Sequence, residues 1–95
     1  MPTLHLGFGT WTRAEHVLLV VPVSSSVRVK RLLNTLSEAG RVIDLTRGRK
    51  RRSLVLLSGE WLIISAVRAK SLRRRLAAAE GNTGGGMLHE EQDQP

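Results

Sequence analysis

The chain has 95 residues, no cysteine and a formal net charge of +7 at neutral pH. This length suits one small domain, whose core is marginal on its own and favours oligomerisation. The absence of cysteine excludes disulfides, thiolate metal sites and thiol chemistry. No apolar run approaches the roughly 20 residues of a membrane helix, and the N-terminus lacks a secretory signal pattern. We therefore expect a cytoplasmic protein.

The charge is unevenly distributed along the chain. Residues 1–80 contain all fifteen Lys and Arg residues and five acidic residues, for a net charge of +10. Residues 81–95 contain three acidic residues and no cation. A basic portion of this kind points to a polyanionic partner, which composition alone leaves open among DNA, RNA and an anionic membrane surface.

The first elements in chain order are two predicted strands. Residues 3–8 alternate around Leu4, Leu6 and Phe8, and the glycines on either side of Phe8 suggest a bend or bulge. Residues 16–21 are nearly all aliphatic, which is typical of a strand buried on both faces or in an interface. Pro22 is expected to end this strand.

A helix and a short strand follow. Ser24, Ser25 and Ser26 offer N-cap hydroxyls, and Gly40 stands where a glycine commonly ends a helix. Residues 41–45 then read as a short strand. Between these signals, apolar residues at helical spacing form one stripe: Val29, Leu32, Leu33 and Leu36.

The remaining elements complete an α+β domain. Residues 53–57 and 61–67 read as strands joined by a tight turn, and residues 69–79 as a helix with Leu72, Leu76 and Ala79 facing inward. The order ββ-α-βββ-α predicts a small, mainly antiparallel sheet with two helices. We assign residues 1–80 to this domain and residues 81–95 to a disordered, acidic, Gly-rich tail.

Catalytic and metal sites are poorly supported by the sequence. His5, His16 and His89 are widely spaced and have no metal-ligand pattern. Asp44 is the one acidic residue in an apolar strand, and we interpret it as a structural carboxylate that caps a turn or pairs with an arginine, rather than as a general base. We expect no enzymatic activity, no cofactor, no metal and no small-molecule substrate.

The strongest functional signal is a run of cations between two predicted strands. It contains five cations in six positions and no acidic residue, and Arg presents a planar fork that suits phosphate oxygens or guanine edges. The alternative is a solvated turn or a charged strand edge that resists aggregation. We expect nucleic-acid contact by the members of this run, Arg47, Arg49, Lys50, Arg51 and Arg52.

Two further basic clusters lie on the predicted helices. Arg28, Lys30 and Arg31 at the start of the first helix could extend the same surface, and a helix N-terminus favours phosphate. Arg73, Arg74 and Arg75 on the last helix could be a solvated face or a contact site. With only three aromatic residues, duplex backbone contact is favoured over base stacking on single strands.

Four segments resemble the RemA family of bacterial regulatory proteins: "LHLGFG", "VKRLL", "RVIDLTRGRKRR" and "LIISAV". The resemblance is collinear over about residues 3–76. It implies a DNA-binding transcriptional regulator of the kind that activates extracellular-matrix genes in biofilms. It also implies a LytTR-like fold and a homo-oligomeric ring that duplex DNA contacts around the outside, without a membrane partner.

The resemblance also assigns residues. The two family cations after the turn glycine, which contact DNA, correspond to Arg49 and Lys50; a further arginine corresponds to Arg52, and the helix pair to Lys30 and Arg31. His16 stands where relatives usually carry an arginine linked to assembly or DNA contact. An RNA-binding or ribosome-associated module, and a structural oligomer that binds no nucleic acid, are the alternative readings.

Overall fold

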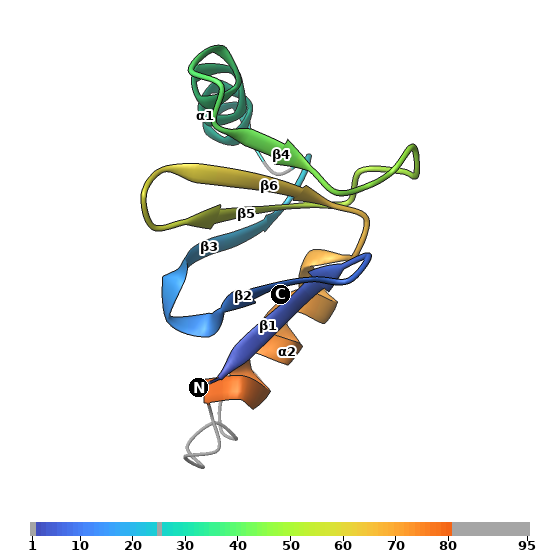
Figure 1. The fold of residues 1–95 in the computed structure, drawn as a ribbon. Coiled ribbons are helices and arrows are strands. Elements are labelled where there is room, and N and C mark those ends of the chain that lie inside the picture. Colours follow the sequence, from blue (N-terminus) through green and yellow to red (C-terminus); the bar gives the residue numbers. More distant parts are fainter. Residues whose placement is uncertain (1, 25, 81–95) are drawn as a thin grey trace.

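The computed structural model describes residues 2–24 and 26–80, so the predicted tail lies outside the described residues. Figure 1 shows a sheet with α1 on one side and α2 with a small hairpin on the other. No helix in the described ranges is long and apolar enough to cross a membrane. The elements in chain order are β1 (Thr3–Gly7), β2 (Thr10–Arg13), the 3-10 turn η1 (Ala14–His16), β3 (Val17–Pro22), α1 (Val27–Glu38), β4 (Val42–Asp44), β5 (Ser53–Leu57), β6 (Trp61–Ser65) and α2 (Ala69–Glu80).

The strands form two sheets. β1 and β2 make an antiparallel hairpin, and the larger sheet has the order β3-β5-β6-β4. Its β3–β5 and β5–β6 pairs are antiparallel, whereas β4 runs parallel to β6. The α+β class and the two helices are confirmed. The sheet is mixed and not purely antiparallel, however, because α1 lies between β3 and β4 and returns the chain to the end of the sheet where β3 begins, so that β4 runs parallel to β6.

β2 was not predicted from the sequence. Its residues alternate without an apolar face directed to the core, because its one large apolar side chain, Trp11, is 61% exposed. The strand forms through backbone pairing with β1, in which Thr3 lies opposite Arg13 and His5 opposite Trp11. Periodicity cannot detect a strand whose side chains are not sorted between core and solvent.

The larger sheet separates two apolar cores. On one face Val55 and Ile63 pack with Leu4 and Leu6 of β1 and with Leu72 of α2. On the other face a second cluster lies beneath α1, and it includes Leu36, Leu54, Leu62 and Ile64. Because successive strand residues point to opposite faces, β5 and β6 are apolar at nearly every position, as their sequences indicated.

The ends of α1 follow the predicted signals. The Ser26 hydroxyl accepts a hydrogen bond from the backbone N–H of Val29 (3.2 Å), which satisfies one of the unpaired donors of the first turn. At the other end Gly40 adopts a positive φ of 73°, and its N–H donates to the carbonyl of Ser37. These interactions fix both ends of the helix.

The strand predicted at residues 16–21 corresponds to β3, and its bounds and burial differ from the prediction. It begins at Val17 rather than His16, because residues 14–16 form a 3-10 turn anchored by the buried Ala14. It extends to Pro22, at an edge where a missing N–H is tolerated. Within the chain this strand is not buried on both faces, since Leu18 is 61% and Leu19 is 40% exposed. These two leucines help to line an open groove of about 240 Å³ between β3 and α2.

Candidate nucleic-acid interface

Residues 46–52, in the connection between β4 and β5, form a turn that we call the cation loop. Asp44 at the end of β4 orders its first residues, since its Oδ1 accepts hydrogen bonds from the backbone N–H (2.8 Å) and the hydroxyl (2.6 Å) of the buried Thr46. The N–H of Arg49 then donates to the carbonyl of Thr46 (3.0 Å), and Gly48 supplies a φ of 82°. The loop is therefore a defined turn.

Asp44 also neutralises one cation of the loop. Its Oδ2 lies 3.1 Å from Nη2 of Arg51. The hydrogen bond from the Thr46 hydroxyl, followed by that from the Thr46 N–H and the charge of Arg51, lowers the pKa of Asp44 below its ordinary value of 3.8. The predicted role of Asp44 as a turn cap and arginine partner is confirmed. Arg51 therefore has an acidic partner within the chain.

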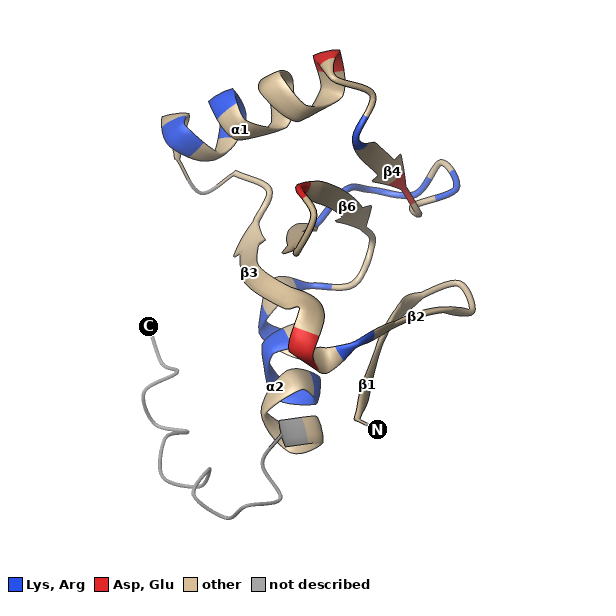
Figure 2. Cartoon of the chain, turned by 60° about the vertical axis from the view of Figure 1, so that its left-hand side comes forward, with Lys and Arg blue, Asp and Glu red and all other residues tan. Residues whose placement is uncertain are grey.

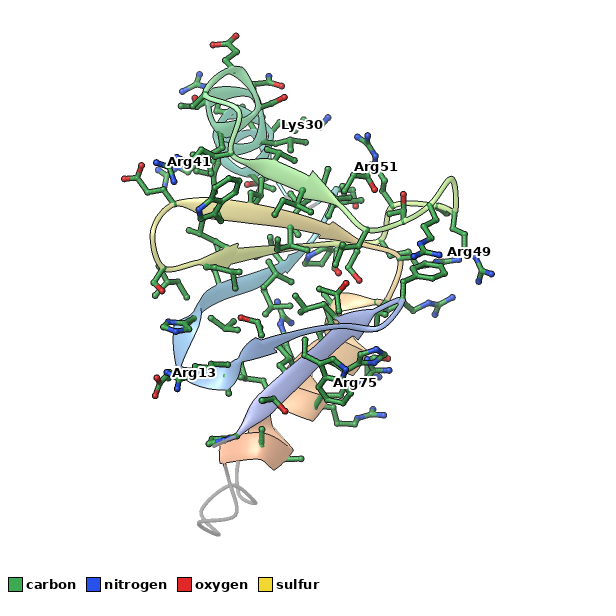
Figure 3. All side chains as sticks on the ribbon, viewed as in Figure 1. Arg13, Lys30, Arg41, Arg49, Arg51 and Arg75 are labelled. Atoms are coloured by element: carbon green, nitrogen blue, oxygen red, sulfur yellow. The ribbon has the colours of Figure 1, made fainter. Side chains whose placement is uncertain are left out.

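The other members of the cation loop differ in their availability. Arg47, Arg49 and Lys50 are exposed, and none of them has a carboxylate partner in residues 2–24 and 26–80. Figure 3 shows Arg49 extending at the outer end of the loop, while Arg51 lies closer to β4. Arg52 is half-buried at the foot of the loop, where its N–H donates to the carbonyl of Ser65 (2.9 Å).

The β1–β2 turn contacts the cation loop through Phe8. The guanidinium carbons of Arg47 and Arg49 lie 5.1 and 5.0 Å from the centroid of the Phe8 ring, within the range of a cation–π interaction. Phe8 and Arg47 both have positive φ values, 48° and 53°, at a cost of roughly 1–3 kcal/mol each. The glycines beside Phe8 predicted the bend but not this contact, because residue spacing carries no information about which loops meet.

A buried serine links the hairpin to the foot of the cation loop. Ser65, at the end of β6, donates its hydroxyl to the carbonyl of Leu6 (2.7 Å) and accepts from the N–H of Val67 (3.0 Å). Its own carbonyl accepts from Arg52 (2.9 Å). A Cβ at Gly7 would lie only 3.3 Å from Cγ2 of Val67, so the hairpin approaches this segment closely. These contacts hold the two loops in fixed positions relative to each other.

The remaining predicted residues do not join the cation loop within one chain. Arg28, Lys30 and Arg31 are exposed in the first turn of α1, and Figure 2 shows this turn on the opposite side of the molecule from the β4–β5 connection. His16 directly precedes β3, and its Nδ1 lies 3.0 Å from the hydroxyl of Ser58, which follows β5 and so lies at the opposite end of that strand from the cation loop. The predicted residues therefore lie in three separate regions.

The arginines of α2 have partners inside the chain. Arg73 donates through Nε and Nη2 to the carbonyl of Val20 (3.2 and 3.0 Å), and Arg75 donates to the carbonyl of His5 (3.0 Å). These bonds connect α2 to the edge strand β3 and to β1. Two of the three arginines in this cluster therefore have acceptors within the chain, and a contact of the cluster with a ligand stays a prediction.

Comparison with known proteins finds a matching family and several similar relatives. A family model described as "RemA-like: Extracellular matrix regulatory protein A-like" matches residues 3–76. Three similar relatives each bear the name "Putative regulatory protein". The relative from Desulfosudis oleivorans is 38% identical over 79 residues, which cover 83% of this chain and 80% of the relative.

The other two relatives have similar coverage. The protein from Desulfatibacillum aliphaticivorans is 36% identical over 77 residues, covering 81% of this chain and 85% of the relative. The protein from Halothermothrix orenii is 30% identical over 79 residues, covering 83% and 93%. The match to the family model, over residues 3–76, includes the hairpin, the cation loop and most of α2.

Proposed function

Because the chain belongs to the RemA-like family of regulatory proteins, we propose that it is a cytoplasmic transcriptional regulator that binds duplex DNA through the cation loop and acts as a homo-oligomeric ring. It binds DNA without catalysing a reaction and needs no cofactor. The observation that carries this proposal is the set of exposed loop cations, Arg47, Arg49 and Lys50, which have no carboxylate partner in the described part of the chain.

The charge arrangement supports a phosphate ligand. Like charges in a short loop repel one another, and phosphates placed between them remove this repulsion. Asp44 balances only Arg51, so the outer end of the loop remains positive. Since Asp44 and Phe8 order the loop, its cations lose less conformational freedom on binding than they would on a flexible segment.

The first turn of α1 offers a second site for phosphate. Arg28 and Lys30 lie near its N-terminus, which has no acidic residue in the first turn. Cations are unfavourable at the positive end of a helix, by about 0.3–1 kcal/mol, and a bound anion offsets this cost. Because this turn is distant from the cation loop, duplex DNA would contact both only by spanning the molecule or by passing between neighbouring subunits of an oligomer.

The apolar surface supports assembly. Leu18 and Leu19 on the edge strand β3 are exposed, and they lie in the groove lined by Leu76 and Ala77 of α2. A domain of this size gains stability by burying such side chains against another copy. In a ring, each subunit would contribute one cation loop, and the repeated loops would form a positive belt that suits curved duplex DNA.

The test is fluorescence anisotropy with duplex DNA over a salt series, with the mass of the protein measured by light scattering. Two neutralised phosphates per subunit contribute about −1.8 to the slope of log K against log salt, so the Arg49→Ala, Lys50→Ala double variant should have a slope shallower by about that amount for each bound subunit. The matched control is Lys70→Ala with Arg74→Ala, which removes the same charge from exposed positions on α2.

The outcomes separate the readings. The control should bind nearly as tightly as the wild type, and all three proteins should have the same mass, several times 10.5 kDa. Equal weakening of both double variants would mean that only net charge matters and would reject the loop as the interface. Tighter binding to structured RNA at equal salt would favour an RNA-binding module, and a monomeric mass would reject the ring.

A further inference from the structure

We propose that Phe8 is a positioning residue for the DNA interface: its ring holds the guanidinium groups of Arg47 and Arg49 in the orientation that meets phosphate. This inference rests on the proposed function, which it deepens by assigning part of the interface to a hairpin that itself carries no cation at its tip. The observation behind it is the approach of both guanidinium carbons to one aromatic ring, at 5.1 and 5.0 Å.

The backbone geometry indicates that this contact is specified by the fold. Phe8 and Arg47 are two of the three non-glycine residues with positive φ in the described ranges, and they face each other across the contact. Strained conformations of this kind persist only where the surrounding structure determines them, and they cluster at functional sites. The third, Glu60, lies in the separate turn between β5 and β6.

The tether beneath the contact keeps the ring in place. The hydroxyl of the fully buried Ser65 donates to the carbonyl of Leu6, two residues before Phe8, and the carbonyl of Ser65 accepts from the N–H of Arg52 at the end of the cation loop. One buried residue thus fixes both the hairpin and the loop, so the distance between the ring and the guanidinium groups does not depend on the flexible arginine side chains alone.

The chemistry of the pair suits a role in positioning. An aromatic face attracts a guanidinium group without neutralising its charge, whereas a carboxylate such as Asp44 cancels the charge of its partner. Arg47 and Arg49 therefore remain available to phosphate while their side chains are restrained. A carboxylate at position 8 would order the same side chains and abolish their use for binding an anion.

This role predicts a distinctive pattern of DNA affinities and salt dependence. Phe8 contacts no phosphate, so Phe8→Leu should weaken DNA binding by about fivefold at every salt concentration and leave the salt slope unchanged. Phe8→Tyr keeps an aromatic face and should restore wild-type affinity. Trp11→Leu removes an exposed aromatic residue from the same hairpin. Because the ring of Trp11 lies against His5 and not against an arginine, this variant should bind DNA as the wild type does.

The experiment combines this DNA titration with NMR of the arginine Nε–Hε groups in the free protein, with thermal unfolding to confirm that each variant is folded. Ring-current shifts at Arg47 and Arg49 should be present in the wild type and in Phe8→Tyr, and should be lost in Phe8→Leu. Absent shifts in the free wild type, or an unchanged affinity in Phe8→Leu, would overturn the positioning role while leaving DNA binding intact. A wild type with these shifts but no affinity for DNA would reject the proposed function, and with it the role of Phe8 in DNA binding, while confirming the contact of Phe8 with the two arginines.

Discussion

The cation loop and the middle of α2 contain similar clusters of arginine but use them differently. On α2, Arg73 and Arg75 donate to the carbonyls of Val20 and His5, so their charges stabilise the contact of the helix with β3 and β1. In the cation loop, the guanidinium group of Arg49 lies over the ring of Phe8, and a cation–π contact leaves the hydrogen-bond donors of that group free.

The difference shows that local charge density does not indicate which cations already have hydrogen-bond acceptors within the chain. Both clusters contain three or more cations within a few residues, and both are largely exposed. What distinguishes them is the acceptor that each guanidinium group meets in the folded chain. Mutations that remove these acceptors or donors one at a time can therefore test the comparison, through the stability of the protein and through its affinity for DNA.

The largest effect on stability is expected at Asp44. Its carboxylate accepts hydrogen bonds from the cation loop, as the carbonyls of Val20 and His5 accept them from α2. Asp44→Ala removes acceptors for Thr46 and Arg51, and should lower the free energy of unfolding by about 1.5 kcal/mol, because the loss of a turn cap costs about 0.5–2 kcal/mol and partial exposure weakens the ion pair. Urea denaturation at neutral pH measures this difference. A variant as stable as the wild type would show that the loop turn forms without this cap.

The Asp44 contribution also depends on pH. The folded-state pKa of Asp44 is lowered from 3.8, so its stabilisation is fully present above pH 3.8 and is lost as pH falls through the lower folded-state pKa. The stability gap between the wild type and Asp44→Ala should therefore be constant from pH 7 to pH 5 and should narrow below pH 4. A gap that narrowed already between pH 7 and pH 5 would contradict the assignment to this carboxylate.

A smaller effect is expected from Arg73→Ala on the other side of the comparison. It removes two donors from the carbonyl of Val20, and should destabilise the protein by about 1 kcal/mol because water can partly replace an exposed donor. DNA affinity of the folded variant, measured well below its unfolding temperature, should change by less than that of the cation-loop double variant. The reverse order would mean that α2 belongs to the DNA interface.

The smallest effect is expected from Arg75→Ala, which removes one exposed hydrogen bond to the carbonyl of His5. We expect a loss of about 0.5 kcal/mol, in the lower range for a single bond that solvent can replace. A shift in melting temperature smaller than that of Arg73→Ala would support this ranking. A larger shift would show that the contact of α2 with the hairpin stabilises the fold more than its contact with β3.

The sequence alone predicted the elements in which side-chain periodicity and end signals agree. The apolar stripe and Ser26 located α1, and the continuous apolar runs located β5 and β6 because both faces of these strands are covered. Asp44 was correctly interpreted because an acidic residue beside a turn has short-range partners. The cation loop could also be located from sequence, since it depends on residues that are neighbours in the chain.

Only the tertiary structure decided the relations between distant segments. β2 has no buried face and forms because β1 supplies its hydrogen bonds, and the parallel pairing of β4 with β6 depends on where α1 returns the chain. Phe8 contacts the cation loop, and Arg73 donates to the carbonyl of Val20; these contacts join residues 39 to 53 positions apart in the sequence. Composition and local pattern determined which residues carry charge; packing determined which charges meet an internal acceptor and which remain available to a ligand.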